Sequence, residues 1–329
     1  MTLYGLAVLM TVFGMVLLAL DLLLLALTPR LLEALGRVSP DRRARAIMGV
    51  RFAPLGFTMV LILGVSVPAW LRHEPFNTGE AVSGPLLAVA LLVLLPALQG
   101  ARRGTRMFVK TRDRLRAWRY LSLRSSRTIA PFEVVEVRSD DLALCVGGYL
   151  KPTIYASTGV VRALKEAEFK AALAHEISHA RARDPLRLLW MAACPDFLQI
   201  FGLDQAWRRE FARACEFGAD AGASGSDPER ALDLASALLK VARLRTFRPL
   251  SPVAALDVAV SSAFSSQAEL QERIEVLANP SRDVHAGSTV FAVRPWVLAA
   301  AVIAMVSAGA QVSNEAHHIS EAVGRFLAP

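Results

Sequence analysis

The stretch Glu168-Phe-Lys-Ala-Ala-Leu-Ala-His-Glu-Ile-Ser-His-Ala-Arg181 contains two histidines four residues apart, His175 and His179, with Glu176 directly after the first. It lacks glycine and proline, which predicts a helix, and residues four apart share one face of a helix. Both imidazoles can therefore reach one zinc ion, and Glu176 can accept a proton from a metal-bound water. The stretch predicts a zinc peptidase with one Zn²⁺ per chain, rather than two surface histidines on an ordinary helix.

A catalytic zinc site usually has three protein ligands and keeps its fourth position for water. The expected third ligand is Glu216, which lies 37 residues beyond His179 in a second helical stretch, with Glu210 as the alternative. Asp220 follows Glu216 by one helical turn, so the two share a face. We expect Asp220 to accept a hydrogen bond from the far nitrogen of a ligand histidine and so to fix that ring. The alternative for both acids is a solvated helix face.

Other polar residues near these motifs carry weaker signals. Asp184 precedes Pro185, and an Asp-Pro pair is typical of a helix start, so Asp184 is interpreted as an N-cap. The sequence singles out no residue that would stabilise the oxyanion of a peptide-bond cleavage. Three residues are candidates for that role: Tyr149, Tyr155 and Arg213.

Three strand-like runs precede the histidine-containing stretch, namely Phe132–Val137, Leu142–Val146 and Thr153–Ser157. Each is short and rich in β-branched or apolar residues, and helical signals begin only at Val160. Strands followed by helices predict the α+β class. An extended substrate is expected to pair with the strand-forming segment from Tyr149 to Ser157.

The hydrophobic fraction, 54% of 329 residues, is higher than in an ordinary soluble domain. The excess lies in four apolar blocks, each interpreted as a membrane helix: residues 3–27, 52–70, 81–99 and 296–312. The predicted organisation is three membrane helices with a basic cytoplasmic loop, after the first of them, within residues 1–100, a cytoplasmic metallopeptidase domain within 101–293, and a fourth helix with a short extracytoplasmic tail within 294–329. Asp21, the only charge in the first block, is expected either to be functional or to reach the interface.

Arginines set the predicted orientation. The segments after the first and third blocks are rich in arginine, whereas the segment after the second block holds only Arg72. Basic segments stay on the cytoplasmic side of a membrane. We therefore expect an integral protein of the bacterial cytoplasmic membrane, with the N-terminus outside and the zinc-binding domain in the cytoplasm.

The run from Arg102 to Arg127 contains ten basic residues and one acid, Asp113, which accounts for the whole net charge of +8. Arginines interleaved with Trp118 and Tyr120 could contact nucleic acid. A basic run beside a membrane helix is also attracted to anionic lipid. Its position directly after the third apolar block favours anionic lipid, and no nucleic-acid partner is expected.

Two stretches resemble the BlaR/MecR-type antirepressor membrane metallopeptidases, which are gluzincins: Cys145-Val-Gly-Gly-Tyr-Leu-Lys-Pro-Thr-Ile-Tyr-Ala-Ser-Thr-Gly159 and Leu173-Ala-His-Glu-Ile-Ser-His-Ala-Arg-Ala-Arg-Asp-Pro-Leu-Arg187. In that family a Lys-Pro-x-Ile-Tyr strand precedes the zinc helix, an Arg-Asp pair follows it, and a later Glu-x-x-x-Asp supplies the third ligand. The resemblance implies a zincin-like α+β domain inserted between membrane helices, and regulatory cleavage of a protein or peptide substrate at the cytoplasmic face. Only about 17 residues follow the fourth block, so a penicillin-binding sensor is not expected.

Two alternatives stay open. The chain also resembles the heat-shock and CAAX-processing membrane proteases through its HExxH, its Glu-x-x-x-Asp and the late Arg273-Ile-Glu-Val-Leu277. An alternative of a different class is a non-catalytic membrane signalling or scaffold protein with a structural or vestigial zinc site. That alternative is disfavoured because no third histidine or cysteine lies near the motif to close the metal site, and Glu176 would have no purpose there.

Overall fold

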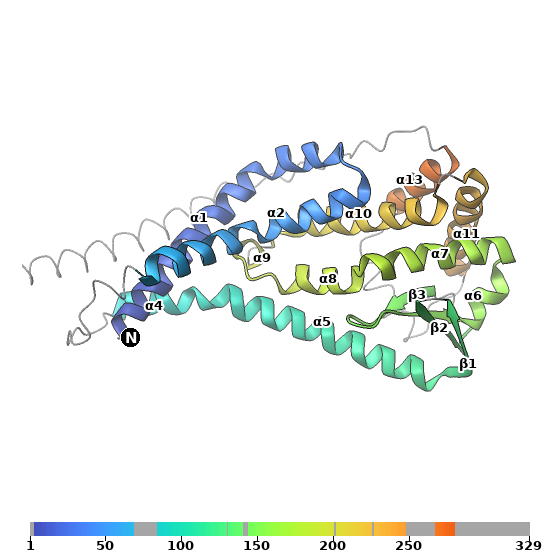
Figure 1. Cartoon of the computed structure of the whole chain (residues 1–329), viewed down its shortest axis with the longest axis horizontal. Coiled ribbons are helices and arrows are strands. Elements are labelled where there is room, and N and C mark those ends of the chain that lie inside the picture. Colours follow the sequence, from blue (N-terminus) through green and yellow to red (C-terminus); the bar gives the residue numbers. More distant parts are fainter. Residues whose placement is uncertain are drawn as a thin grey trace, which may run out of the picture.

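The structure, a computed structural model, describes residues 3–68, 84–129, 131–140, 144–200, 202–225, 227–247 and 267–279. Long helices run along the molecule and a small sheet lies near one end (Figure 1). The elements are, in chain order, α1 (Leu3–Gly36), α2 (Pro40–Leu61), the π-helix η1 (Ile62–Ser66), α4 (Gly84–Leu92), α5 (Leu94–Tyr120), β1 (Ser122–Ile129), β2 (Phe132–Val137), β3 (Leu144–Gly147), β4 (Thr153–Ser157), α6 (Thr158–Ala163), α7 (Glu166–Ala182), α8 (Asp184–Ala193), α9 (Phe197–Ile200), α10 (Gln205–Ser224), α11 (Pro228–Phe247) and α13 (Gln267–Ala278).

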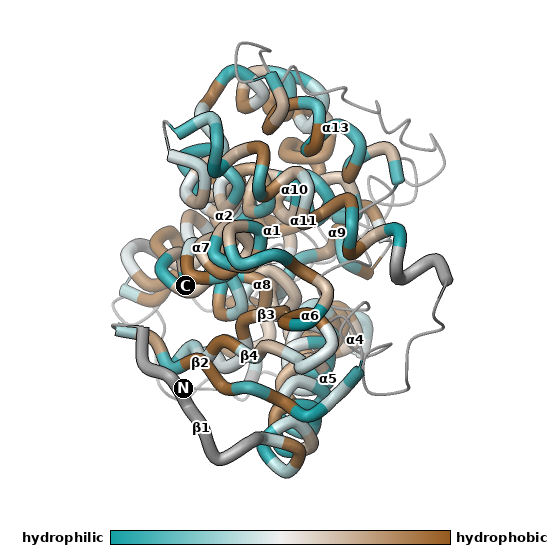
Figure 2. Tube along the Cα trace, turned by 90° about the vertical axis from the view of Figure 1, so that its right-hand side faces the viewer, coloured by the Kyte–Doolittle hydropathy of each residue, from teal (hydrophilic) through white to brown (hydrophobic). Residues whose placement is uncertain are grey.

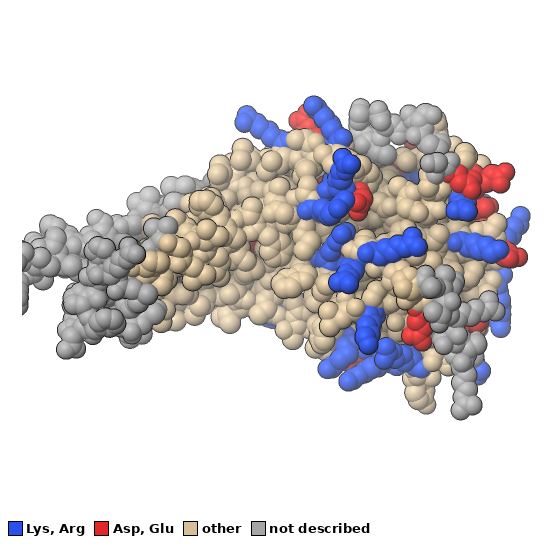
Figure 3. All heavy atoms as spheres, viewed as in Figure 1, with Lys and Arg blue, Asp and Glu red and all other residues tan. Residues whose placement is uncertain are grey.

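Within the described residues, three helices are long and apolar enough to cross a membrane: Tyr4–Gly36, Pro40–Gly64 and Gly84–Tyr120, which runs through α4 and α5. They contain most of the first three predicted blocks, and the fourth block, residues 296–312, lies outside the described residues. The three helices have 33, 25 and 37 residues, whereas about 20 residues cross the hydrocarbon core of a bilayer. Each helix is therefore longer than a single crossing requires. Figure 3 shows an uncharged surface toward one end of the molecule and charged residues toward the other.

The arginine-rich segment after the first apolar block is not a loop, because only three residues join α1 to α2. Arg43 and Arg51 lie within α2, and their side chains are 6% and 0% exposed. Arg43 pairs with Glu210, and Arg51 pairs with Asp196. This hydrophilic segment forms a buried helix because α2 packs along α10. Its buried arginines are paired there with acidic side chains, which offsets the cost of burying their charges.

One hydrophobic cluster joins the apolar helices α1 and α2 to the second half of the chain. Leu24 of α1 and Ile47 of α2 belong to the same buried cluster as Trp207 of α10. Asp21 is fully buried, and its carboxylate accepts a hydrogen bond of 2.8 Å from the backbone N–H of Phe197 in α9. Asp21 therefore does not reach the membrane–water interface. Its hydrogen bond connects α1 to α9, the short helix that precedes α10.

The four strands form one sheet in the order β1-β2-β4-β3. β2 and β4 are parallel, whereas β1 with β2 and β3 with β4 are antiparallel. The predicted strands Phe132–Val137 and Thr153–Ser157 agree with β2 and β4, and Leu142–Val146 overlaps β3. The sequence does not predict β1, which lies at the end of the basic run and has no regular apolar alternation. Its pairing with β2 overrides its weak strand pattern.

β4 is enclosed within the sheet. Both of its edges are paired, one with β2 and the other with β3, and all five of its residues are buried. The expectation that Thr153–Ser157 pairs with a substrate is therefore wrong, because no hydrogen-bonding edge is left. β3 is instead an outer strand of the sheet.

The helices of the second half form layers on the sheet. Viewed along the molecule, α7 and α8 lie between the sheet on one side and α10 and α13 on the other (Figure 2). α7 contacts β3 and β4 on one face and α10 and α11 on another. The helix with the two histidines is thus the middle layer, where side chains from several elements can converge.

Candidate metal centre

α7 is fixed at both of its ends. At its start, the carboxylate of Glu168 accepts hydrogen bonds from the backbone N–H of Lys165 and from the side chains of Ser236 and Lys240 in α11, at 2.7–2.8 Å. At its end, Arg183 adopts a left-handed conformation with a φ of 56°. α8 therefore begins after a bend and does not continue α7, which places its first residue beside the last turn of α7.

Three potential ligands converge between α7 and α10. The Nε2 atoms of His175 and His179 are 3.0 Å apart, and each lies 3.7 Å from a carboxylate oxygen of Glu216. The three side chains are 8%, 13% and 16% exposed. Among the described residues, these three form the group of histidine, cysteine and acidic side chains whose ligand atoms could hold a metal ion, all within 4.8 Å of one another.

The spacing of these atoms fits zinc. Zinc bonds to histidine nitrogen and carboxylate oxygen are about 2.0–2.2 Å long, so the ligand atoms of a tetrahedral site lie about 3.3–3.6 Å apart. The observed separations of 3.0 and 3.7 Å bracket this value. Two imidazoles with one carboxylate also form the ligand set of catalytic zinc sites that keep a position for water.

Each histidine has a carboxylate partner on its far nitrogen. Nδ1 of His175 lies 2.9 Å from a carboxylate oxygen of Asp220, whose side chain is 5% exposed. Nδ1 of His179 lies 2.7 Å from Asp184, whose side chain is 7% exposed. With Nδ1 engaged in this way, Nε2 of both rings is directed toward the shared centre.

The interpretation of Asp184 as an N-cap is wrong. Arg183 occupies the cap position of α8 without a side-chain cap bond, and Asp184 is the first residue of the helix itself. Its carboxylate instead contacts His179 and accepts a hydrogen bond of 3.2 Å from Arg187. The Asp-Pro pattern identifies the helix start correctly, but the bend at Arg183 turns this side chain back toward α7.

Arg273 of α13 is the residue at this centre that the ligand and catalytic assignments miss. Its guanidinium makes two hydrogen bonds to Asp220, of 2.7 and 2.8 Å, and lies 2.6 Å from Glu216. Arg273 is 5% exposed. In the sequence it stands out only as the first residue of Arg-Ile-Glu-Val-Leu277, because its partner Asp220 lies 53 residues earlier.

Residues 121–272 match peptidase family M48. The matched segment contains His175, Glu176, His179 and Glu216, and it ends one residue before Arg273. M48 peptidases are typically zinc-dependent. The match supports a metallopeptidase but does not single out the BlaR/MecR type. No curated protein and no solved structure matches the chain.

Charged neighbours shift two pKa values at the centre. Burial opposes ionisation of Asp220, yet the guanidinium of Arg273 holds the pKa of that carboxyl well below its usual range. Burial likewise opposes protonation of His179, but the hydrogen bond to Asp184 and the neighbouring carboxylates raise its pKa to about 9. A metal ion that binds Nε2 of His179 must therefore displace a proton at neutral pH.

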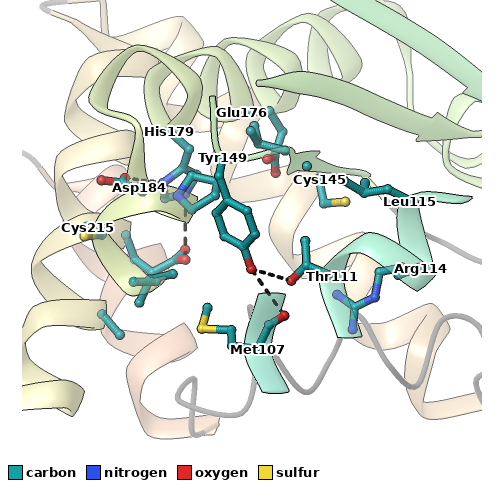
Figure 4. A pocket seen from close by; sticks show the side chains of 16 residues that line it. Met107, Thr111, Arg114, Leu115, Cys145, Tyr149, Glu176, His179, Asp184 and Cys215 are labelled. Atoms are coloured by element: carbon teal, nitrogen blue, oxygen red, sulfur yellow. Dashed lines mark hydrogen bonds and ion pairs between the residues drawn. The ribbon is translucent and has the colours of Figure 1, made fainter. Parts of the chain in front are cut away.

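A cavity of about 100 Å³ adjoins two of the three potential ligands, His179 and Glu216. Glu176, His179 and Glu216 lie on its metal-facing wall. The opposite wall comes from α5, β3 and the turn after β3 (Figure 4), and includes Met107, Thr111, Leu115, Cys145 and Tyr149. The charged groups of the metal-facing wall thus come from the M48-like segment, whereas α5, which precedes the match and is part of a helix long and apolar enough to cross a membrane, contributes to the opposite wall.

Of the three oxyanion candidates, only Tyr149 lies at the cavity, where its hydroxyl donates a hydrogen bond of 2.8 Å to Thr111. Tyr155 is 1% exposed and packs edge-on against Trp118 in the core, away from the cavity. Arg213 is also absent from the cavity wall.

Two residues of α10 that the sequence offers as candidates are paired elsewhere. Arg213 forms an ion pair with Glu272 of α13 and lies over the ring of Phe217, 5.3 Å from its centroid. Glu210, the alternative ligand, forms its ion pair with Arg43. Neither residue belongs to the group that could hold a metal.

Proposed function

We propose that the protein is a membrane-anchored zinc endopeptidase that cleaves a protein or peptide substrate at the cytoplasmic face. The observation that carries the proposal is the convergence of His175, His179 and Glu216 at zinc-ligand spacing beside a cavity that Glu176 also lines. The match to peptidase family M48 supports the same chemistry.

In this mechanism His175, His179 and Glu216 would hold Zn²⁺, which when bound acidifies a water and polarises the scissile carbonyl. Glu176 accepts the proton of the attacking water on its carboxylate and delivers it to the leaving amide nitrogen. Asp184 and Asp220 keep the two imidazole rings oriented.

The substrate strand in this proposal is β3 and not β4. β3 pairs with β4 along one edge, and Cys145, Val146 and Gly147 of β3 line the cavity. An extended peptide that pairs with an outer strand gains main-chain hydrogen bonds and requires little of the peptide sequence. A peptide on β3 would run past Glu176, which fits an endopeptidase of broad sequence tolerance.

Anionic lipid is the proposed partner of the basic run 102–127, but only of its first part. α5 carries the run as a straight helix up to Tyr120. In the described part of the chain the third span begins at Gly84, and about 20 residues cross the hydrocarbon core, which places the end of the core near Gly104. At about 1.5 Å per residue, Tyr120 lies about 24 Å beyond Gly104, too far out to contact the headgroups. The lipid-contacting residues would be Arg102 and Arg106, on the cytoplasmic side that the arginine pattern predicts.

Two biological roles fit this chemistry. Regulatory proteolysis follows from the BlaR/MecR resemblance. Membrane-protein quality control follows from the resemblance to heat-shock and CAAX-processing proteases, and one observation favours it: Arg273, which begins the late motif of that resemblance, contacts both Glu216 and Asp220. A scaffold protein with a vestigial zinc site would not need Glu176 beside the cavity.

The test compares the zinc content of the purified full chain with its cleavage of a casein-like substrate, for wild type and for Glu176→Gln. We expect about one zinc per chain in both proteins and cleavage by the wild type only. Equal cleavage by both proteins would contradict the mechanism. Zinc without cleavage in the wild type would favour the scaffold alternative.

A further inference from the structure

Three large apolar side chains are exposed on three different elements near the cavity. Leu150, in the turn between β3 and β4, is 81% exposed, Trp190 of α8 is 53% exposed, and Phe108 of α5 is 46% exposed. One exposed apolar residue is normal on a protein surface and needs no explanation. These three side chains also share one level along the bilayer normal, as the position of each in the fold indicates.

The depth of Phe108 follows from α5. In the part of the chain that the structure describes, the third span begins at Gly84. At about 1.5 Å per residue, about 20 residues from that point cross the hydrocarbon core, to about Gly104. Phe108 then lies about 6 Å further out. The headgroup layer on each side of the core is about 5–8 Å thick. Phe108 is therefore at the level of the headgroups.

The depth of Trp190 follows from the contact between α8 and α5, which run in opposite directions (Figure 1). The two helices approach so closely that a Cβ on Gly104 would lie 2.9 Å from the Cβ of Ala193. Ala193 is thus at the level of Gly104. Trp190 precedes Ala193 by three residues and lies about 4–5 Å further from the hydrocarbon core, close to the level of Phe108.

The depth of Leu150 follows from its neighbour Tyr149. The ring of Tyr149 stacks on Phe108 with centroids 5.6 Å apart, and its hydroxyl donates a hydrogen bond to Thr111. Gly148, with a φ of 94°, makes the turn possible, since a Cβ there would lie 2.5 Å from the carbonyl oxygen of Lys151. Leu150 follows Tyr149 directly in the chain, so it lies close to the level of Phe108.

We propose that Leu150, Phe108 and Trp190 form a membrane-contact surface that faces the headgroup layer of an anionic phospholipid bilayer. Tryptophan favours this depth because its ring is amphipathic, and exposed phenylalanine and leucine side chains bury their apolar surface at the boundary between headgroups and acyl chains. Basic neighbours suit anionic headgroups, and three exposed ones lie beside the aromatic residues in the sequence: Arg106, Lys110 and Lys151.

The surface has a consequence for the cavity. Tyr149 and Thr111 belong both to the cavity wall and to the link that fixes the turn to α5. The cavity therefore lies within about 10–15 Å of the hydrocarbon core. Peptide bonds close to a membrane anchor would reach it more readily than bonds far out in the cytoplasm. The surface itself rests on the three membrane helices and not on peptidase activity.

The test measures depth with nitroxide labels on the full chain in vesicles of phosphatidylcholine and phosphatidylglycerol. Labels replace Leu150, Leu98 or Tyr120 in turn; the last two are 63% and 90% exposed on α5 and serve as references within and beyond the bilayer. Collision of each label with oxygen and with a water-soluble nickel chelate is measured by electron paramagnetic resonance.

The background for these labels is Cys145→Ala, since the two other cysteines, Cys194 and Cys215, are only 1% and 7% exposed and do not compete for the reagent. We expect Leu98→Cys to read as deep, Tyr120→Cys as aqueous, and Leu150→Cys as within about 5 Å of the phosphates. A Leu150 label as accessible to nickel as the Tyr120 label overturns the proposal. A Leu98 label that reads as aqueous also overturns the proposal, because it shows that α5 does not cross the bilayer at that point. That result would leave the proposed peptidase chemistry unaffected.

Discussion

The two walls of the cavity are built in different ways. On the metal-facing wall, charged side chains are connected by ion pairs. His175 and His179 each contact a carboxylate, and Arg273 contacts both Glu216 and Asp220. On the opposite wall, apolar side chains of α5 and β3 predominate, and Tyr149 links the turn after β3 to Thr111.

This difference predicts which property of the protein a substitution on each wall should change. A buried charge that loses its partner costs far more than a neutral hydrogen bond that is lost. Changes on the metal-facing wall should therefore alter metal affinity and turnover. Changes on the opposite wall should alter substrate binding and leave the metal in place.

The largest effect is expected for Glu216→Ala, with Glu210→Ala as the matched control on the same helix. Loss of Glu216 removes one of three zinc ligands, so zinc should be lost on dialysis and cleavage should fall by at least about 10³-fold. Loss of Glu210 leaves Arg43 buried without its partner and should cost about 3–5 kcal/mol of stability. Folded Glu210→Ala should keep its zinc; if it loses zinc while Glu216→Ala does not, the ligand assignment is wrong.

The next effect concerns α13. Arg273→Gln should weaken zinc binding by about 10–100-fold, because outer contacts of metal ligands typically contribute that much. Glu272→Gln is the control: it breaks the ion pair of α13 with Arg213 but leaves Glu216 and Asp220 untouched. Competition with a chelator measures the affinity, and the spectrum of the cobalt-substituted protein reports the ligand geometry. Equal losses in both variants would mean that Arg273 acts only by docking α13.

A smaller effect is expected for the carboxylates behind the histidines. Asp184→Asn and Asp220→Asn keep the shape of the side chain but remove its charge, so each should weaken zinc binding by about tenfold, at the lower end for such contacts. Metal competition at pH 7 measures both. An unchanged affinity for Asp184→Asn would show that its contact with His179 does not orient the ring.

The sequence predicts the parts of this wall that are local. Two histidines one turn apart on α7, and two acids one turn apart on α10, meet because helix periodicity alone places each pair on one face. β2 and β4 follow from β-branched runs in the same way. What the sequence cannot provide is the approach of these helices to each other: Gly222, whose Cβ would lie 2.6 Å from Ser178, is needed for α10 to contact α7.

The features that sequence reasoning misses depend on partners far along the chain. Arg43 and Arg51 are charged, so the sequence places them in an exposed loop. The acids that allow their burial, Glu210 and Asp196, lie more than a hundred residues further along the chain. Arg273 is missed for the same reason. The direction of Asp184 depends on a single left-handed residue, and nothing in an Asp-Pro pattern encodes that conformation.

The smallest effect is expected on the opposite wall. Tyr149→Phe removes the donor of the hydrogen bond to Thr111, and Thr111→Val removes the acceptor of the same bond. A neutral hydrogen bond contributes about 0.5–1.5 kcal/mol, so both variants should raise KM by about two- to tenfold. Zinc content and kcat should stay near wild type, because neither residue is among the three potential metal ligands.

The pair of variants also tests whether Tyr149 stabilises the oxyanion, as the sequence allows. In that case the phenol would donate a hydrogen bond to the oxyanion that forms during cleavage, and its loss would lower kcat by about 10²–10³-fold, the usual cost of one oxyanion donor. Thr111→Val would leave that donor in place and change kcat little. A large kcat difference between the two variants would therefore assign Tyr149 to catalysis, whereas equal and modest KM effects would assign it to holding the turn after β3 against α5.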